Sequence, residues 1–281
     1  MAGATTRWWS KETVAVVTGA NKGIGFEFTR QLAKNGITTV LTARDEGRGK
    51  EAVEALRREG LDVTFHPLDV HSDESARTLA NWVKQTYGGL DILVNNAGVA
   101  KRAVNLENVD LVMQTNYFGV KRVTEAMLPI LRHTSAGSRI VIVASRAGLL
   151  KMLRNKFAQE LADRENLTEE KINDFVKAYT EDVKNGTWEN GGWAERNTTY
   201  NVSKVAVNGY LTVLDRALSQ RPEGEKIYVN SFCPGFTKTD LTEGKGSEDI
   251  AGAVQTGLWL ALHPPGGPSG KFWTDGQETG F

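Results

Sequence analysis

The 281-residue sequence predicts an α/β fold, a doubly wound parallel sheet with helices on both faces. Two observations predict it: short apolar runs rich in β-branched residues recur along the chain, and segments with helical periodicity separate them. An alternating order of strand and helix requires crossover connections, which make neighbouring strands parallel. The sequence contains no Pro/Gly/Ser-rich linker, low-complexity tract or internal repeat. We therefore expect a single domain over residues 1–281.

The predicted elements alternate from the amino terminus onward. The first strand covers "TVAVVT" (13–18), and a glycine-rich turn joins it to a helix over 24–36. Ile24, Phe28 and Leu32 lie at helical spacing in that helix. Five later strands are expected at "TTVLTA" (38–43), "DVTFHP" (62–67), "LDILVNN" (90–96), "SRIVIVAS" (138–145) and "KIYVNSF" (226–232). A sheet of this kind binds ligands beyond the carboxyl ends of its strands, where the strand order reverses.

The segment 146–197 interrupts this alternation, just before a helix that begins near residue 198. Apolar residues at helical spacing predict two amphipathic helices within it. Their apolar stripes are Leu149, Leu150, Met152, Leu153, Phe157 and Leu161 in the first, and Ile172, Phe175, Val176, Tyr179 and Val183 in the second. Thr168, followed by two glutamates, is a favourable start for the second helix. Two surface helices packed on the body and a cover over the substrate are both compatible with this helical insert.

The composition excludes several classes of partner. The sequence has 34 basic and 34 acidic residues, so its formal charge is zero and it has no electrostatic footprint for nucleic acid or anionic membrane. A small, uncharged molecule is the expected partner. Cys233, the only cysteine, excludes an internal disulfide and indicates an inert buried thiol. The four histidines, His66, His71, His133 and His263, lie at no metal-ligand spacing, so we expect no metal site.

The amino-terminal segment "MAGATTRWWSKE" is too short and too polar for a secretory signal. The sequence also lacks an apolar run of about 18 residues, the length that a membrane span requires. We therefore expect a soluble, cytoplasmic protein. Trp8 and Trp9 form either an arm packed on the surface or a contact with a lid.

The glycine loop "TGANKGIG" (18–25) joins the first predicted strand to the first helix. Gly19, Gly23 and Gly25 stand where a side chain would obstruct the turn, a ligand or the packing of the helix. The amino terminus of the helix offers free N–H groups and a positive dipole end to a pyrophosphate. The spacing is GxxxGxG, and the loop lacks the GK[ST] sequence of a P-loop.

The residues after the second strand favour NADP over NAD. An NAD site usually ends this strand with an acid that accepts a hydrogen bond from the ribose 2′-hydroxyl, and "TTVLTA" ends without one. Arg44, Arg48 and Lys22 would suit a 2′-phosphate through charge-assisted hydrogen bonds. Asp45 is the alternative, because it becomes the ribose acid if the strand ends two residues later.

Polar residues also follow the third and fourth strands. In "LDV" (68–70), Asp69 can bond the adenine amino group, or it can cap the helix that begins near Ser72. In "NNAG" (95–98), both asparagines can bond backbone groups, while Ala97 and Gly98 leave room for a flat ligand.

Two Tyr/Lys pairs share the same offset of four residues. Tyr200 and Lys204 lie in "TTYNVSK", and Tyr117 and Lys121 lie in "NYFGVK". Each pair occupies one face of a helix, where an ammonium can act on a phenol. Spacing alone does not tell which of the two pairs handles a proton.

The motifs in their order resemble the short-chain dehydrogenase/reductase family over nearly the whole chain. The matching segments are "TGANKGIG", "NNAG", Asn116, Ser145 in "ASRAG", Tyr200 with Lys204 in "YNVSK", and "PGFTKTD". The insert and "NKGIG…LTARDEGRG" look most like monomeric carbonyl reductases, especially plant salutaridine-reductase-like and menthone-reductase-like enzymes. The resemblance implies a Rossmann fold with the insert placed before the catalytic helix.

The resemblance assigns the catalytic roles. It makes Tyr200 the proton donor and Lys204 its partner, with Tyr117 and Lys121 as a packing pair. A close ammonium is expected to lower the pKa of the Tyr200 phenol by about 1 to 3 units. Ser145 would bond the substrate oxygen, and Asn116 would hold a water that relays the proton. The family's "SSxxG" pattern is altered at Ala144, but the catalytic member is the second serine, which is retained.

The resemblance also implies NADPH/NADP as cofactor and names the residues that hold it. They are Gly19, Asn21, Lys22, Gly23, Ile24, Gly25, Arg44, Arg48, Asp69, Val70, Asn95, Ala97, Gly98, Tyr200, Lys204, Pro234, Gly235, Thr237 and Thr239. The segment after "CPGFTKTD" would be a substrate lid, and Ser247 before two acids is a favourable helix start.

These features predict an NADPH-dependent carbonyl reductase that acts on an apolar ketone or aldehyde and can also oxidise the alcohol. Related reductases of carbon–carbon double bonds replace the tyrosine with an acid, so Tyr200 favours carbonyl chemistry. An NADP sensor without catalysis is the alternative from another class, although such proteins tend to lose a catalytic residue. Nucleotide-sugar epimerases have a different glycine loop and a longer substrate domain. If the insert covers the helix that pairs subunits in many relatives, the protein is a monomer.

Overall fold

The computed structural model describes residues 7–222 and 224–281. Within these residues the chain forms one eight-stranded sheet with the order β3-β2-β1-β4-β5-β6-β7-β8. The first seven strands are parallel, and β8 runs antiparallel to β7. The strands are β1 Val14–Val17, β2 Thr38–Ala43, β3 Val63–Pro67, β4 Ile92–Asn95, β5 Ser138–Val143, β6 Ile227–Cys233, β7 Lys271–Thr274 and β8 Gln277–Thr279. This order confirms the predicted doubly wound α/β fold.

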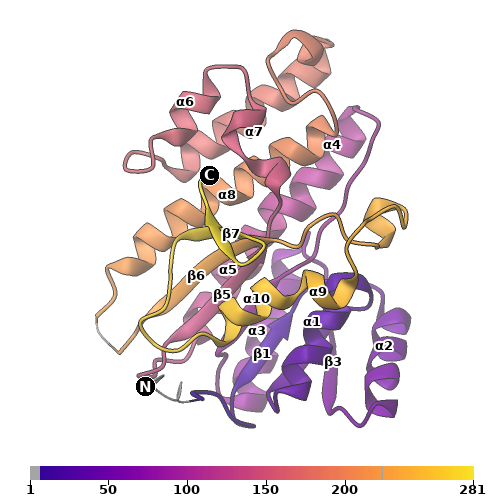
Figure 1. Ribbon diagram of the computed structural model, residues 1–281, viewed down its shortest axis with the longest axis vertical. Coiled ribbons are helices and arrows are strands. Elements are labelled where there is room, and N and C mark those ends of the chain that lie inside the picture. The colour runs from indigo at the N-terminus through magenta and orange to yellow at the C-terminus, as the bar shows by residue number, and fades with distance from the viewer. Residues whose placement is uncertain (1–6, 223) are drawn as a thin grey trace.

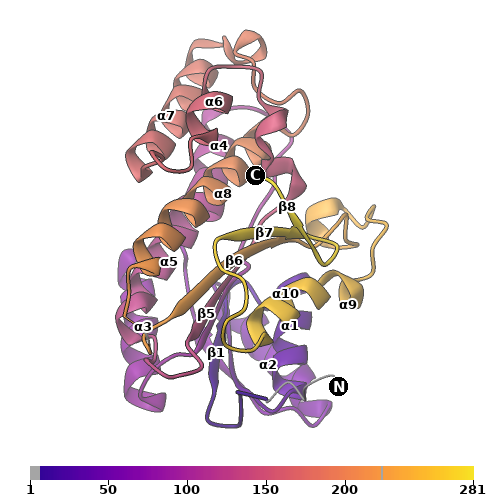
Figure 2. The ribbon, with the colours of Figure 1, turned by 60° about the vertical axis from the view of Figure 1, so that its left-hand side comes forward.

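Helices cover both faces of the sheet (Figure 1). They are α1 Gly23–Lys34, α2 Glu46–Arg58, α3 Asp73–Tyr87, α4 Leu106–Met113, α5 Gly119–Met127, α6 Phe157–Ala162, α7 Glu169–Asn185, α8 Thr198–Ser219, α9 Ile250–Ala253 and α10 Gln255–Leu262. Figure 2 shows α3, α5 and α8 on one side of the sheet and α1, α2, α9 and α10 on the other. Each side has its own buried apolar cluster. No helix of the described residues is long and apolar enough to cross a membrane.

The strand order reverses at β1, which pairs with β2 on one side and β4 on the other. The helices that follow these strands lie on opposite faces of the sheet, α1 after β1 and α5 after β4 (Figure 2). The carboxyl ends of β1 and β4 therefore leave a crevice between them. All six predicted strands are present. Two further strands, β7 and β8, were not indicated by the sequence patterns.

The first predicted helix of the insert is absent. Two 3₁₀ turns and one short helix take its place, η3 Arg146–Gly148, η4 Leu150–Met152 and α6. Leu149 and Leu153 are buried, so the apolar stripe is a real contact surface although its backbone is not a continuous helix. A Cβ at Gly148 would lie 2.4 Å from the carbonyl oxygen of Lys204. The chain therefore passes directly against α8, where the side chains of a continuous helix would not fit.

The second predicted helix of the insert is present as α7. Thr168 is its N-cap, and the Thr168 hydroxyl accepts a hydrogen bond from the Lys171 N–H at 3.3 Å. The predicted apolar stripe faces inward, with Ile172, Phe175 and Tyr179 fully buried. Helix α7 packs against α8 and α4 at one end of the molecule (Figure 1).

The tryptophans near the amino terminus pack on the body as an arm. The Trp8 indole N–H donates to the Leu262 carbonyl at 3.2 Å, and the guanidinium of Arg139 lies 3.9 Å from the Trp8 ring centroid. Arg139 stands near the start of β5, at the amino-terminal edge of the sheet. Among the two interpretations, this position agrees with a packed arm, because ligands of such a sheet bind at the opposite edge.

Candidate active site

A cavity of about 270 Å³ lies beyond the carboxyl ends of β1, β4, β5 and β6, where the predicted site residues converge. Among those predicted, the residues that line it are Gly19, Lys22, Gly23, Ile24, Gly98, Ser145, Tyr200, Lys204, Pro234, Gly235, Thr237 and Thr239. Residues that the sequence reasoning did not assign to a ligand also line it, namely Asn96, Val143, Ala144, Lys238, Asp240, Leu241, Thr242 and Ile250. Seven of these follow a strand end directly or lie on the segment after β6. Their closeness to the motifs in the sequence could have predicted that they line the site.

The glycine loop packs tightly against the turn after β4. Gly19 has a φ of +60°, and a Cβ there would lie 2.8 Å from the Ala97 Cα. A Cβ at Gly25 would lie 2.4 Å from the Asn96 amide nitrogen. The Thr18 hydroxyl accepts hydrogen bonds from the Asn96 and Ala97 N–H groups, each at 2.9 Å. Small residues are therefore required here, and the loop backbone at the start of α1 is left open toward the cavity, as a pyrophosphate site requires.

The structure separates the roles of the two asparagines in "NNAG". Asn95 is the last residue of β4; its side chain is buried and donates to the Thr124 hydroxyl at 2.9 Å, so it does not face the cavity. Asn96 lines the cavity and donates to the carbonyls of Thr18 and Gly19 at 2.9 and 3.0 Å. Side chains alternate along a strand, so one residue further along points to the other face. That alternation could have favoured Asn96 over Asn95.

The cations expected for a 2′-phosphate lie near the end of β2. Arg44 follows the strand directly and is exposed, with no ion pair to any described residue. Asp45 is the N-cap of α2, where its carboxylate accepts from the Arg48 N–H at 2.8 Å. Lys22 forms an exposed ion pair with Asp240 across the cavity mouth. The alternative, that Asp45 binds the ribose of NAD, required β2 to end two residues later. Since β2 ends at Ala43 and Asp45 caps α2, the structure does not support that alternative.

Asp69 and Val70 follow β3 at the same edge of the sheet. The Asp69 carboxylate accepts from the His71 N–H at 3.0 Å, and Ser72 is the N-cap of α3. The Val70 carbonyl accepts from Arg122 at 2.7 Å. Asp69 therefore shapes the turn before α3 without being its cap, and its second carboxylate oxygen has no partner among the described residues. Asn21, Gly25 and Ala97 belong to the glycine loop or its packing partner and are not among the residues that line the cavity.

Tyr200 lies in the first turn of α8, is partly buried, and lines the cavity together with Ser145. Burial raises the pKa of Tyr200 to about 12, although the nearby Ser145 side chain acts in the opposite direction. The expectation that Lys204 lowers this pKa is wrong for the arrangement in this structure. The reason is that the Lys204 ammonium points elsewhere, so the loss of solvent dominates.

Lys204 is buried one helical turn beyond Tyr200. Its ammonium donates to the Val143 carbonyl at 2.7 Å and lies 5.6 Å from the Tyr200 ring centroid. Burial lowers the pKa of Lys204 to about 8. An ammonium has three donors, and only one bonds to a described residue, so two remain for a ligand in the cavity that Lys204 lines.

Asn116 lies at the centre of a π-helical turn, η1 Gln114–Phe118, between α4 and α5. Such turns are frequent at functional sites because they displace one backbone segment from the helical register. The Asn116 side chain accepts from the Val99 N–H and donates to the Val99 carbonyl and the Ser203 hydroxyl, each at 2.9 Å. Ser203 in turn donates to the Tyr200 carbonyl at 2.7 Å. Asn116 is therefore fixed to the catalytic helix, with its side-chain hydrogen bonds already made.

The second Tyr/Lys pair lies away from the cavity. Tyr117 is fully buried and donates to the Asn173 side chain on α7 at 2.9 Å. Burial raises the pKa of Tyr117 well above its usual range. Lys121 forms ion pairs with Glu169 and Glu125. This pair anchors α7 to the body, as expected of a packing pair.

The segment after β6 covers one side of the cavity. Thr237 and Glu248 form an isolated parallel bridge at its base, and the Thr237 hydroxyl donates to the Pro234 carbonyl at 2.9 Å. Thr239 begins the short 3₁₀ turn η6 Asp240–Thr242. The predicted helix start at Ser247 is wrong, since α9 begins at Ile250 and Asp249 is its N-cap. Asp249 is the N-cap because its carboxylate accepts a hydrogen bond from the Gly252 N–H, which has no acceptor within the helix.

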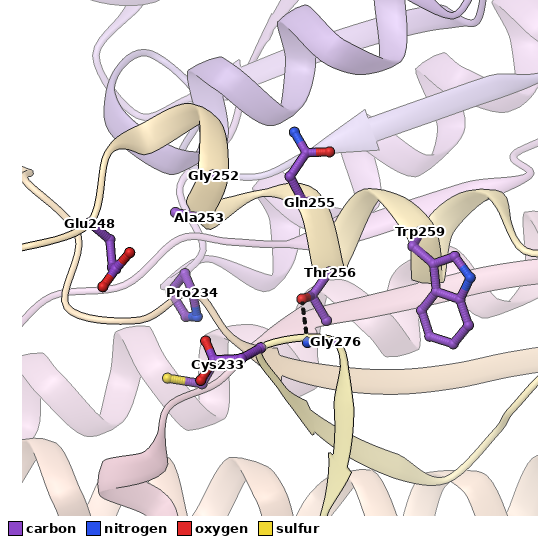
Figure 3. A pocket seen from close by; sticks show the side chains of 10 residues that line it. Cys233, Pro234, Glu248, Gly252, Ala253, Gln255, Thr256, Trp259 and Gly276 are labelled. Carbon is purple, nitrogen blue, oxygen red and sulfur yellow. Dashed lines mark hydrogen bonds between the residues drawn. The ribbon is translucent and has the colours of Figure 1, made fainter.

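A second cavity of about 490 Å³ lies between the end of β6, the β7–β8 turn and helices α9 and α10 (Figure 3). Cys233, Pro234 and Trp259 are among its lining residues, and the Gly276 N–H donates to the Thr256 hydroxyl across it at 3.1 Å. None of the four predicted catalytic residues lines it. The 270 Å³ cavity is therefore the candidate active site.

Comparisons with known proteins identify relatives of this chain. Residues 13–156 match the family model described as short chain dehydrogenase. The (+)-neomenthol dehydrogenase of Arabidopsis thaliana is 41% identical over an alignment of 296 positions, which covers 95% of this chain and 97% of that protein. Carbonyl reductase 3 of Rattus norvegicus, whose name specifies NADPH, is 40% identical over 260 residues, which cover 90% of this chain and 91% of that protein.

A solved structure shows the same architecture. Salutaridine reductase from Papaver somniferum superposes with a TM-score of 0.87 at 36% identity, covering 93% of this chain and 99% of that one. The glycine loop, the Ser145, Tyr200 and Lys204 arrangement, and these similarities lead to one conclusion. The chain belongs to the short-chain dehydrogenase family of oxidoreductases.

Proposed function

We propose that the protein reduces an apolar ketone or aldehyde with NADPH and that Tyr200 donates the proton. The observation that carries this proposal is that Tyr200 and Ser145 line the same cavity, which extends to the glycine loop. Lys204 lines the same cavity. A phenol, a hydroxyl and an ammonium are thus arranged around the space where a carbonyl oxygen would lie.

The cavity fits a dinucleotide that carries a 2′-phosphate. The glycine loop is tightly packed, because a Cβ at Gly19 or Gly25 would collide with its packing partner. The open backbone of this loop would hold the pyrophosphate. Arg44, with no ion pair to a described residue, would meet the 2′-phosphate. The bound cofactor supplies the hydride. The name of the rat carbonyl reductase, which specifies NADPH, supports the same choice.

The electrostatics of Tyr200 suit a proton donor. With its pKa raised to about 12, the phenol keeps its proton at neutral pH and releases it only to a stronger base, such as a developing alkoxide. Ser145 holds the carbonyl oxygen within reach of that proton. The two free donors of the Lys204 ammonium would bond the ribose of the bound cofactor in the same cavity.

A water that returns the proton would bond to the backbone of Asn116. The side-chain amide of Asn116 is already bonded to Val99 and Ser203, so it has little capacity left for a water. The Asn116 backbone lies in a π-helical turn, a feature that is frequent at functional sites, and we propose its carbonyl as the acceptor for that water. The side chain of Asn116 then serves to hold that carbonyl in place.

The substrate is expected to be apolar. Leu241 lines the cavity and is 43% exposed, and Phe236, on the same segment, is 52% exposed. Large side chains left exposed beside a cavity indicate a surface that an apolar molecule covers. The names of two relatives, neomenthol dehydrogenase and salutaridine reductase, specify small organic molecules as their substrates. An NADP sensor is the weaker alternative, because Asn116, Ser145, Tyr200 and Lys204 are all retained.

A screen of terpenoid, alkaloid and aromatic carbonyls tests the proposal. Each compound is mixed with the protein and NADPH, or NADH as the comparison, and loss of the cofactor's absorbance is followed. We expect turnover of at least one apolar carbonyl, with NADPH preferred. Tight NADPH binding without turnover of any compound would favour the sensor instead.

A further inference from the structure

The first turn of α8 carries Tyr200 and lacks the usual helix cap. Its N-cap residue, Asn197, has a left-handed backbone with a φ of +50°, and its side chain makes no capping hydrogen bond. The left-handed conformation is costly for a residue with a Cβ. An uncapped first turn tends to fray. The catalytic phenol therefore depends on other contacts for a fixed position.

The helical insert supplies those contacts. The Tyr179 hydroxyl on α7 bonds to the Thr199 hydroxyl at 2.7 Å, and both side chains are fully buried. Neither hydroxyl has another partner among the described residues. The Tyr179 ring packs edge-on against Trp193 at 5.1 Å between centroids, and the Trp193 indole donates to Asp182 at 2.8 Å. The Tyr179 hydroxyl is thus held from the insert side and directed at the residue before Tyr200.

Helix geometry connects this bond to the phenol. Successive residues of an α-helix are rotated by about 100°, so Thr199 points toward the insert while Tyr200 points into the cavity. A fixed Thr199 side chain therefore sets the rotation of the first turn, and with it the direction of the Tyr200 ring. Thr198 adds a second attachment, because its hydroxyl donates to the Ala194 carbonyl at 2.7 Å.

We propose that Tyr179 is a positioning residue for Tyr200, and that the insert braces the catalytic helix through the bond between Tyr179 and Thr199. This role rests on the proposed function of Tyr200 as proton donor. It is separate from a cover over the substrate or a block to subunit pairing. Neither of those roles needs a hydroxyl at either position.

Paired substitutions separate positioning from stability. Tyr179→Phe and Thr199→Val each leave one buried hydroxyl without a partner, and each should lower the midpoint of thermal unfolding. The double variant replaces both partners by apolar groups of similar shape, which is close to neutral for stability. We expect its unfolding midpoint to return toward wild type while kcat, measured with NADPH and para-nitrobenzaldehyde, stays about tenfold low in all three variants. KM for both reactants should change little.

Tyr87→Phe is the matched control. Tyr87 also bonds a threonine, Thr64, at 3.3 Å, but on α3 and β3, far from the cavity. Loss of the Tyr87 hydroxyl should leave kcat unchanged. A kcat that recovers together with the stability of the double variant would overturn the proposal, since the pair would then be structural only.

Amide hydrogen exchange gives a second readout that needs no substrate. We expect faster exchange of the N–H groups of residues 201–204, the first of α8 that have helical acceptors, in Tyr179→Phe and in the double variant, with no change there in Tyr87→Phe. Unchanged exchange in the first turn of α8 would overturn the brace. If the wild-type protein reduces no carbonyl, the proposed function fails, and the exchange measurement still decides the role of Tyr179.

Discussion

The role of Tyr200 depends on whether its phenol carries a proton, and the surroundings of the phenol set its pKa. Burial raises the pKa of Tyr200 to about 12 and lowers that of Lys204 to about 8. Both groups are therefore protonated at pH 7, one neutral and the other charged. This is the state that a reductive proton transfer requires.

A pH profile tests this assignment. The lowered pKa of Lys204 means that its charge is present below about pH 8 and lost above it. We expect kcat/KM for carbonyl reduction, which reports ionisations of the free protein, to be level at neutral pH and to fall as the pH rises through about 8. A rate of reduction that increases through this range would indicate that the phenolate is the active form and would contradict a donor role.

Arg44 tests the cofactor assignment at the residue scale. Arg44→Ala should weaken NADPH binding by about tenfold or more and leave NADH binding nearly unchanged, because only NADPH has a 2′-phosphate to lose contacts. Titration of protein fluorescence with each cofactor measures both affinities. Arg58→Ala, at the exposed end of α2, is the control and should alter neither. Equal losses for the two cofactors in Arg44→Ala would remove Arg44 from the 2′-phosphate site.

At the residue scale, the sequence could place most of the site but not the environment of each group. The offset between Tyr117 and Lys121 equals that between Tyr200 and Lys204, so spacing could not distinguish the two pairs, and only the resemblance favoured Tyr200. The Tyr200 pKa is raised by burial of the phenol, and the Lys204 ammonium bonds the Val143 carbonyl, a contact over 61 residues. The partner of Thr199, twenty residues earlier on α7, had no sequence signal.

At the element scale, strand ends and caps were predictable, while tight packing was not. The start of α7 at Thr168 follows from local side-chain capping. The prediction of a first continuous helix in the insert was wrong, because helical spacing cannot show that Gly148 contacts the backbone of Lys204. The strands β7 and β8 are only four and three residues long, so their patterns are too short to be distinctive.

The glycine loop allows a prediction for an element. Gly25→Ala would place a Cβ 2.4 Å from the Asn96 amide and 2.8 Å from the Gly19 carbonyl oxygen. We expect a loss of about 1–3 kcal/mol in the free energy of unfolding, from overpacking, and weaker NADPH binding. Urea unfolding and cofactor titration measure the two effects. Gly47→Ala in the exposed first turn of α2 is the control, since the nearest contact of its Cβ is 3.4 Å; a similar loss there would contradict the packing argument.

At the scale of the whole molecule, the insert predicts the oligomeric state. Most side chains of α8 are buried, and α7 packs along it. In many relatives, the helix with the Tyr/Lys pair contacts its counterpart in another subunit, which needs a free face. We therefore expect a monomer of 30.8 kDa by light scattering at micromolar concentration. A stable tetramer built on α8 would show that this helix still has a free face and would favour a cover over the substrate as the role of the insert.

The central claim is that Tyr200, and not the equally spaced Tyr117, donates the proton. The most direct test is kcat for carbonyl reduction in Tyr200→Phe and Tyr117→Phe, since each loses one hydroxyl from a helical tyrosine. The account predicts a loss of at least about 10²-fold to 10⁴-fold in Tyr200→Phe, with NADPH binding retained, and a small effect in Tyr117→Phe. Near-normal turnover by Tyr200→Phe, or an equal loss in Tyr117→Phe, would contradict it.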